Sequence, residues 1–166
     1  MYSIQNFKKM AELQEEFNRL KEQNDNIYHS TILPTIKTEV SNLFNALKDF
    51  FASNELEIAD ISNNKYQAIH INSIIEVEKV GQEIKLKIDS EEIDVIRPYI
   101  SPVKYSAPQE IVKPDKLERS INGLQERLLA EKGVAKSYSD LRIKFINKNN
   151  ALFQDKEEVI KRLFGN

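Results

Sequence analysis

An apolar stripe within residues 33–51 constrains the fold of this chain more than any other feature. Its members recur at alternating spacings of three and four residues: Leu33, Ile36, Val40, Leu43, Leu47 and Phe50. This rhythm places all of them on one side of an α-helix. The sequence therefore predicts a strongly amphipathic helix whose apolar face must be covered, either by the core of the chain or by another chain.

A second amphipathic helix is expected before it, from Ser3 to about Asn26. Its stripe has the same rhythm: Met10, Leu13, Phe17, Leu20, Asn24 and Ile27. Only a short polar break, residues 24–30, separates the two helices, so they pack most simply as an antiparallel hairpin. The matched stripes also permit coiled-coil pairing with a second copy of the chain. Asn24 is either a polar position that fixes such pairing or, as we favour, part of a fraying last turn.

After Phe51 the apolar period changes from helical to two, which is typical of strands. Short segments rich in Ile and Val follow, at residues 56–61, 66–71, 74–80, 84–89 and 93–97. Gly81 suits the first central position of a two-residue hairpin turn. Because Lys85 and Lys87 alternate with apolar residues, we expect an antiparallel sheet with one face exposed to water.

The C-terminal part begins with a proline-rich span, since four of the five prolines lie between Pro98 and Pro114. These prolines predict an edge strand that continues as an extended connector. A third helix is expected from the last of these prolines to Gly133, an end-cap position. Residues 140–147 alternate like a strand, although a helix stays open there. The chain is expected to end in a short helix capped at Asp155.

The predicted fold class is α+β, in one domain or one domain with an appendage. We expect four parts: an antiparallel helical hairpin (1–53), which is also a possible dimerisation element; an antiparallel β-meander of four or five strands (54–103); a proline-rich connector (104–114); and a C-terminal helix–strand–helix segment packed on the same domain (115–166).

The sequence is poor in catalytic signatures. It has no cysteine and only two histidines, His29 and His70, so the usual zinc sites are not expected. Four scattered glycines cannot form a phosphate-binding loop. The densest carboxylate group, residues 89–94, lacks the glycine of a calcium loop and is expected to be a solvated acidic turn. We therefore expect no cofactor and no metal.

No segment reaches the ~20 apolar residues that a membrane span needs, and no secretory signal begins the sequence. The expectation is a cytoplasmic protein that does not contact a membrane. Its charge is uneven, because residues 1–102 carry 11 Lys and Arg against 17 Asp and Glu, whereas residues 103–166 carry 13 against 9. An acidic partner of the C-terminal third is one consequence of this asymmetry.

The leading hypothesis is a non-enzymatic protein–protein interaction module, such as an adaptor, a chaperone-like protein or an immunity or antitoxin-like protein. It would form a homodimer through these residues: Leu13, Phe17, Leu20, Val40, Leu43, Leu47 and Phe50. The first alternative is nucleic-acid binding by the basic third, through Arg142, Lys144, Lys148, Lys161 and Arg162. The second alternative is a carboxylate-dependent hydrolase that uses Asp89, Glu92 and His70.

Overall fold

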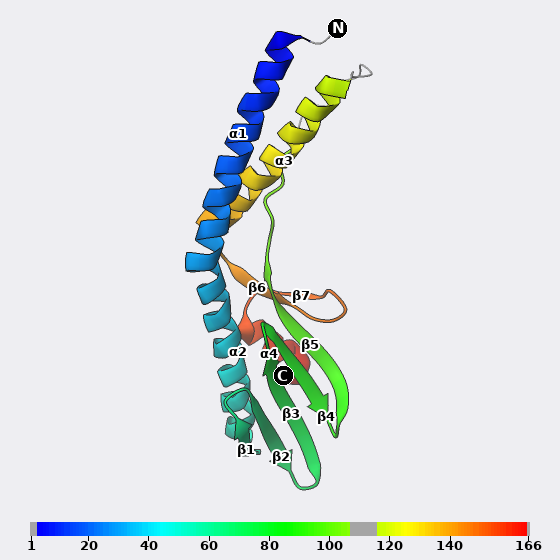
Figure 1. Cartoon of the computed structure of the whole chain (residues 1–166). Coiled ribbons are helices and arrows are strands. Elements are labelled where there is room, and N and C mark those ends of the chain that lie inside the picture. Colours follow the sequence, from blue (N-terminus) through cyan, green and yellow to red (C-terminus); the bar gives the residue numbers. More distant parts are fainter. Residues whose placement is uncertain (1–2, 107–115, 166) are drawn as a thin grey trace. The chain divides into compact units, whose positions relative to one another are not determined.

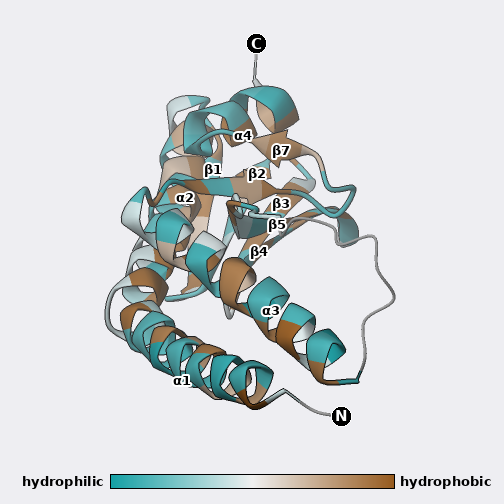
Figure 2. Cartoon of the chain, turned by 90° about the horizontal axis from the view of Figure 1, so that it is seen from above, coloured by the Kyte–Doolittle hydropathy of each residue, from teal (hydrophilic) through white to brown (hydrophobic). Residues whose placement is uncertain are grey.

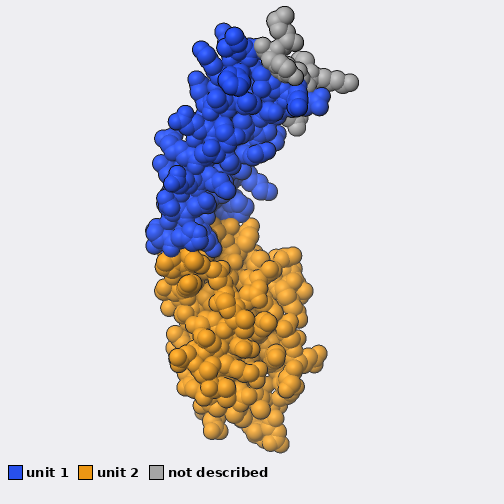
Figure 3. Space-filling model, in the orientation of Figure 1, with its two compact units in different colours: residues 1–32, 101–141 blue, residues 33–100, 142–166 orange. Residues whose placement is uncertain are grey.

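The computed structural model describes residues 3–106 and 116–165, and its α+β class confirms the expectation (Figure 1). The chain divides into two compact units, drawn in different colours in Figure 3. Unit 1 comprises residues 1–32 and 101–141, and unit 2 comprises residues 33–100 and 142–166. The helices are α1 (Ile4–Ile27), the π-helical turn η1 (Tyr28–Ile32), α2 (Leu33–Ser53), α3 (Lys116–Ser139) and α4 (Lys156–Phe164).

The polar residues 24–30 do not form the expected break, because the backbone stays helical from α1 through η1 into α2. The expectation of an antiparallel hairpin within residues 1–53 is therefore corrected, and the helix that packs on α1 in unit 1 is α3. Pro34 lacks the N–H that would close the preceding α-helical turn, and the wider π-helical turn lies directly before it. The polarity of this stretch instead serves a tertiary contact made by Asn24.

Unit 2 contains an antiparallel sheet whose strands are arranged in sequence order, as a meander requires. The strands are β1 (Glu57–Ser62), β2 (Lys65–His70), β3 (Ser73–Val80), β4 (Glu83–Ile88), β5 (Glu91–Ile100), β6 (Ile143–Ile146) and β7 (Leu152–Phe153). The first five confirm the predicted meander. β6 confirms that residues 140–147 include a strand, and β7 extends the sheet beyond what was expected.

The core of unit 2 lies between α2 and one face of this sheet. Three members of the α2 stripe, Val40, Leu43 and Leu47, are each at most 2% exposed. Tyr66 and Leu86 are fully buried on the facing strands, where buried and less buried residues alternate. α4 contacts α2, β6 and β7, and Phe164 of α4 stacks edge-on against Phe51 of α2 at 5.0 Å. Both helices of unit 2 therefore cover the same face.

Tyr66 is a buried titratable group in this core. Its hydroxyl donates a hydrogen bond to the Phe44 carbonyl at 3.2 Å, and its ring packs edge-on against the Phe44 ring. Burial raises the pKa of the Tyr66 hydroxyl above its ordinary value of 10.0, and the carboxylates of Asp49 and Asp60 raise it further. The folded chain thus keeps a proton that the unfolded chain releases at alkaline pH.

The contribution of Tyr66 to the free energy of unfolding should consequently be fully present below pH 10 and decrease as the pH rises above it. Tyr66→Phe should lose about 1 kcal/mol at neutral pH with its hydrogen bond, and show a flatter alkaline profile. Urea unfolding at a series of pH values measures both effects. The control is Tyr105→Phe, because the Tyr105 side chain is 47% exposed. Identical alkaline profiles for the two variants would contradict this assignment.

Candidate interaction surface

Unit 1 is built on the pairing of α1 with α3, which begin at the same end of the unit and run in the same direction (Figure 1). Apolar residues recur along both helices between hydrophilic ones (Figure 2). On α3, the side chains of Ile121, Leu124 and Leu128 are 7% exposed or less. These residues are spaced three and four apart along the helix, so α3 has this apolar face covered.

The stripe on α1 is covered unevenly. Ile4 is 74% exposed and Phe7 is 61% exposed, and both continue the stripe toward the N-terminus at spacings of three residues. Leu13, Phe17 and Leu20 are half-buried, and only Asn24 is buried, at 3% exposed. The apolar surface of α1 is thus most open over its first two turns.

Asn24 joins the two helices through a buried polar contact. Its Nδ2 donates to the backbone carbonyl of Glu131 at 2.9 Å and to the Glu131 carboxylate at 2.8 Å. Nearby, the Tyr28 and Tyr138 rings lie 6.4 Å apart, and burial raises the pKa of the Tyr138 hydroxyl. Asn24 is therefore not in a fraying turn. It is the polar position expected to fix helix pairing, but its partner lies in the same chain.

The backbone after β5 approaches α3 closely at Gly133. A Cβ at this position would overlap the carbonyl oxygen of Val103. One turn later, the Ser137 hydroxyl accepts a hydrogen bond from the Val103 N–H at 3.0 Å. Gly133 is thus not the end cap that the sequence suggested, because α3 continues to Ser139 and the missing side chain admits another backbone. Residues 107–114 of the expected connector lie outside the described residues.

The α2 half of the expected self-association interface is not on the surface. Val40, Leu43 and Leu47 are enclosed by the sheet, and Phe50 is half-buried beside Phe51, at 5.7 Å between ring centroids. The expectation that this stripe pairs with a second copy is corrected, because the chain's own strands cover it. The α1 half, Leu13, Phe17 and Leu20, keeps partly exposed side chains.

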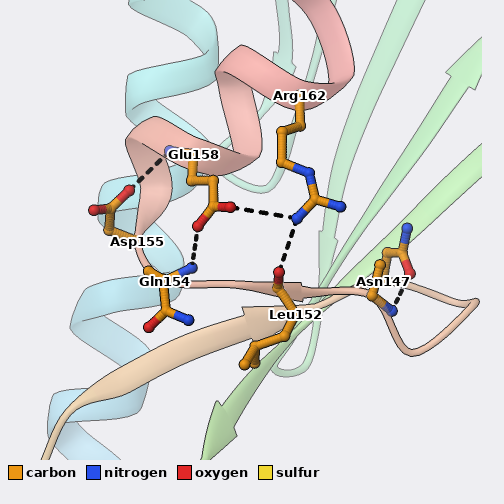
Figure 4. Close-up of polar contacts among 7 residues, drawn as sticks. Asn147, Leu152, Gln154, Asp155, Glu158 and Arg162 are labelled. Carbon is orange, nitrogen blue, oxygen red and sulfur yellow. Dashed lines mark hydrogen bonds and ion pairs between the residues drawn. The ribbon is translucent and has the colours of Figure 1, made fainter.

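The five basic residues of the nucleic-acid hypothesis do not converge on one surface. Lys144 lies on β6 opposite Tyr99, on the sheet face away from α2, whereas Lys161 and Arg162 lie on α4. Arg162 is engaged locally: it donates to the Leu152 carbonyl at 2.9 Å and pairs with Glu158 at 3.3 Å (Figure 4). Arg142 and Lys148 flank β6 and are exposed.

The start of α4 confirms the expected cap. Asp155 accepts a hydrogen bond from the Glu158 N–H at 2.8 Å, and the Glu158 carboxylate accepts one from the Gln154 N–H (Figure 4). The first bond satisfies one N–H group that the first helical turn leaves without a partner, and the second holds the residue before the cap against the helix. Glu158 therefore serves both the cap and the ion pair with Arg162.

The carboxylates of the hydrolase hypothesis have structural or solvent roles. Asp89, Glu92 and His70 are exposed, and Asp89 accepts a hydrogen bond from the Ile74 N–H at 2.8 Å. Asp94, in contrast, is 5% exposed and accepts hydrogen bonds from Asn147 and Lys148, both at 3.2 Å. The acidic turn is thus solvated except at Asp94. In the described ranges, no group of three or more His, Asp or Glu side chains is arranged to hold a metal ion.

Two further findings bear on function. No helix within residues 3–106 and 116–165 is long and apolar enough to cross a membrane. Comparison with family models, with curated proteins and with solved structures finds no match.

Proposed function

We propose that this chain is a non-enzymatic protein–protein interaction module that forms a homodimer through α1. The observation that carries the proposal is the exposure of Ile4 and Phe7, at 74% and 61%, at the open end of a stripe whose later members are partly covered. Contiguous exposed apolar surface on a folded unit marks interaction sites. Adaptor, chaperone-like and antitoxin-like roles all need such a surface, and none of them needs a catalytic group.

The charges on α1 favour a second copy as the occupant. Lys8 and Lys9 lie near its start, and Glu15 and Glu16 lie two turns later. Two α1 helices lying antiparallel about Glu12 would place Lys8 opposite Glu16 and Lys9 opposite Glu15 of the other copy. The same arrangement brings Phe7 of each copy to Phe17 of the other. Opposite charges beside an apolar seam set the partner and the orientation of paired helices.

The test is the solution mass of the wild-type chain and of Ile4→Asp/Phe7→Asp, measured by light scattering after size exclusion. We expect a dimer for the wild type and a monomer of 19.3 kDa for the double variant. Because both side chains are exposed, these changes leave the contacts inside unit 1 intact. The dimer should persist at high salt, since apolar contacts are not screened.

The control variant is Ile71→Asp in unit 2. Ile71 is 82% exposed and has a positive φ of 56°, a conformation that Asp tolerates better than Ile. This variant should keep the wild-type mass. Self-association through α1 would be refuted by a wild-type chain that stays monomeric at every protein concentration measured. It would also be refuted by a double variant that keeps the mass of a dimer.

A further inference from the structure

The sheet of unit 2 has a second face, which we call the outer face, on the side opposite α2 and α4. Strand alternation assigns side chains to it: Phe145 of β6 is 1% exposed on the core face, so its neighbours Lys144 and Ile146 belong to the outer face. The register pairs these two with Tyr99 and Arg97 of β5, respectively. In the described part of unit 2, neither helix packs on this face.

The cations of the outer face are unevenly neutralised. On β2 and β3, Lys65 forms an ion pair with Glu76 at 3.1 Å, and this contact holds the pKa of the Glu76 carboxyl below its usual value. On β5 and β6, Arg97 and Lys144 form no ion pair with any described residue. The register of β4 with β5 also places Glu83 of β4 opposite Arg97 on this face, but no ion pair joins the two. Lys144 has no such acidic neighbour on β5, because Tyr99 lies opposite it.

An aromatic side chain neighbours both cations on the outer face. Tyr99 follows Arg97 by two residues on the same side of β5, and it is directly opposite Lys144 on β6. Its side chain is half-buried, and so is that of Ile146, whereas Arg97 is exposed. We define the β5–β6 patch as Arg97, Tyr99, Lys144 and Ile146. It combines two cations with an aromatic side chain, on the face of the sheet opposite α2 and α4.

We propose that the β5–β6 patch binds single-stranded nucleic acid. Lysine and arginine side chains contact backbone phosphates, and aromatic side chains on an open sheet stack unpaired bases. An acidic protein would use the same cations, so polyglutamate serves as a competitor in the test, whereas single-stranded nucleic acid would engage the cations through its phosphates and the ring through a base. This inference concerns unit 2 and is independent of the self-association proposed for α1.

The test is fluorescence anisotropy with a labelled oligothymidylate of about 20 nucleotides, longer than the site of a single domain. We expect binding that weakens steeply as salt is raised. Arg97→Glu/Lys144→Glu should weaken it about ten-fold or more by placing two carboxylates against the phosphates. Tyr99→Ala should weaken it about five-fold or more by removing a stacking surface. All variants should keep the association state of the wild type.

The control is Lys37→Glu/Lys161→Glu, which makes the same charge change on exposed residues of α2 and α4, on the opposite side of the sheet. It should bind the oligonucleotide nearly as well as the wild type. Three outcomes would overturn the proposal: no binding at low salt, an equal loss in the control, or competition by polyglutamate with Tyr99→Ala binding normally. The last of these would identify a surface for acidic proteins instead.

Discussion

Replacing Gly133 with alanine is expected to lower the free energy of unfolding of the chain by about 1–3 kcal/mol. The added Cβ would overlap the Val103 carbonyl, which is backbone and cannot rotate aside as a side chain can. Any shift of Val103 also disturbs its hydrogen bond to the Ser137 hydroxyl, which itself donates to the Gly133 carbonyl at 2.9 Å. The substitution therefore acts on packing and on a buried hydrogen-bond network together.

Gly123→Ala is the matched control, because it makes the same chemical change on the same helix. A Cβ at Gly123 meets no atom within 4 Å, so the control should stabilise the chain by about 0.5–1 kcal/mol through better helix propensity. Urea unfolding followed by circular dichroism compares the two. Equal midpoints for Gly133→Ala and the wild type would contradict the close approach of Val103 to α3.

Replacing Leu47 with alanine should cost about 2–5 kcal/mol, because its side chain is fully buried between α2 and the sheet. The sequence alone allowed a different result, in which this residue contacts a second copy and its loss affects association more than folding. The structure predicts the opposite for Leu47→Ala: a large loss of stability, with the association state of the wild type unchanged under conditions in which the variant stays folded.

Ile61→Ala is the comparison for this second prediction. Ile61 lies on β1 of the same unit but is 56% exposed, so its truncation should change stability by at most about 0.5 kcal/mol. Chemical unfolding and light scattering on both variants separate folding from association. If Leu47→Ala unfolds like the wild type but fails to dimerise, α2 rather than α1 is the association surface.

Periodicity predicted which residues are buried. The stripe from Ile36 to Leu47 and the alternation through Lys85 and Lys87 each follow from the geometry of one element, and the structure confirms both. The helix cap at Asp155 was also predicted from the local sequence, and the structure confirms it. These features depend on neighbours in the sequence, so the chain itself contains the information.

The spacing of apolar residues along a helix does not show which other element of the fold covers them. The helices at α1, α2 and α3 have stripes of the same rhythm, and nothing local distinguishes α3 from α2 as the partner of α1. Residues 24–30 and Gly133 are the two places where local rules failed. The polarity of residues 24–30 predicts a break, but Asn24 in this stretch donates a hydrogen bond to Glu131. The missing side chain of Gly133 predicts a helix end, but it makes room for the backbone of Val103.

Only some residues of the candidate surfaces could be predicted from the sequence. The half-buried Leu13, Phe17 and Leu20 were predicted, whereas Ile4 and Phe7 were missed, although their spacing of three residues continues the same stripe. Lys144 was identified as basic, but its neighbours on the outer face come from β5, and strand pairing is a tertiary property. Charge counting therefore grouped Lys144 with Lys161, which lies on α4.

The most direct test of self-association is a dipolar distance between two copies. The chain has no cysteine, so Gln14→Cys, an exposed position on α1, gives one spin label per chain. Because packed helix axes lie about 8–10 Å apart, an α1–α1 dimer predicts a short and well-defined interspin distance, which Ile4→Asp/Phe7→Asp should abolish. Absence of intermolecular dipolar coupling in the labelled chain at high protein concentration would contradict the account.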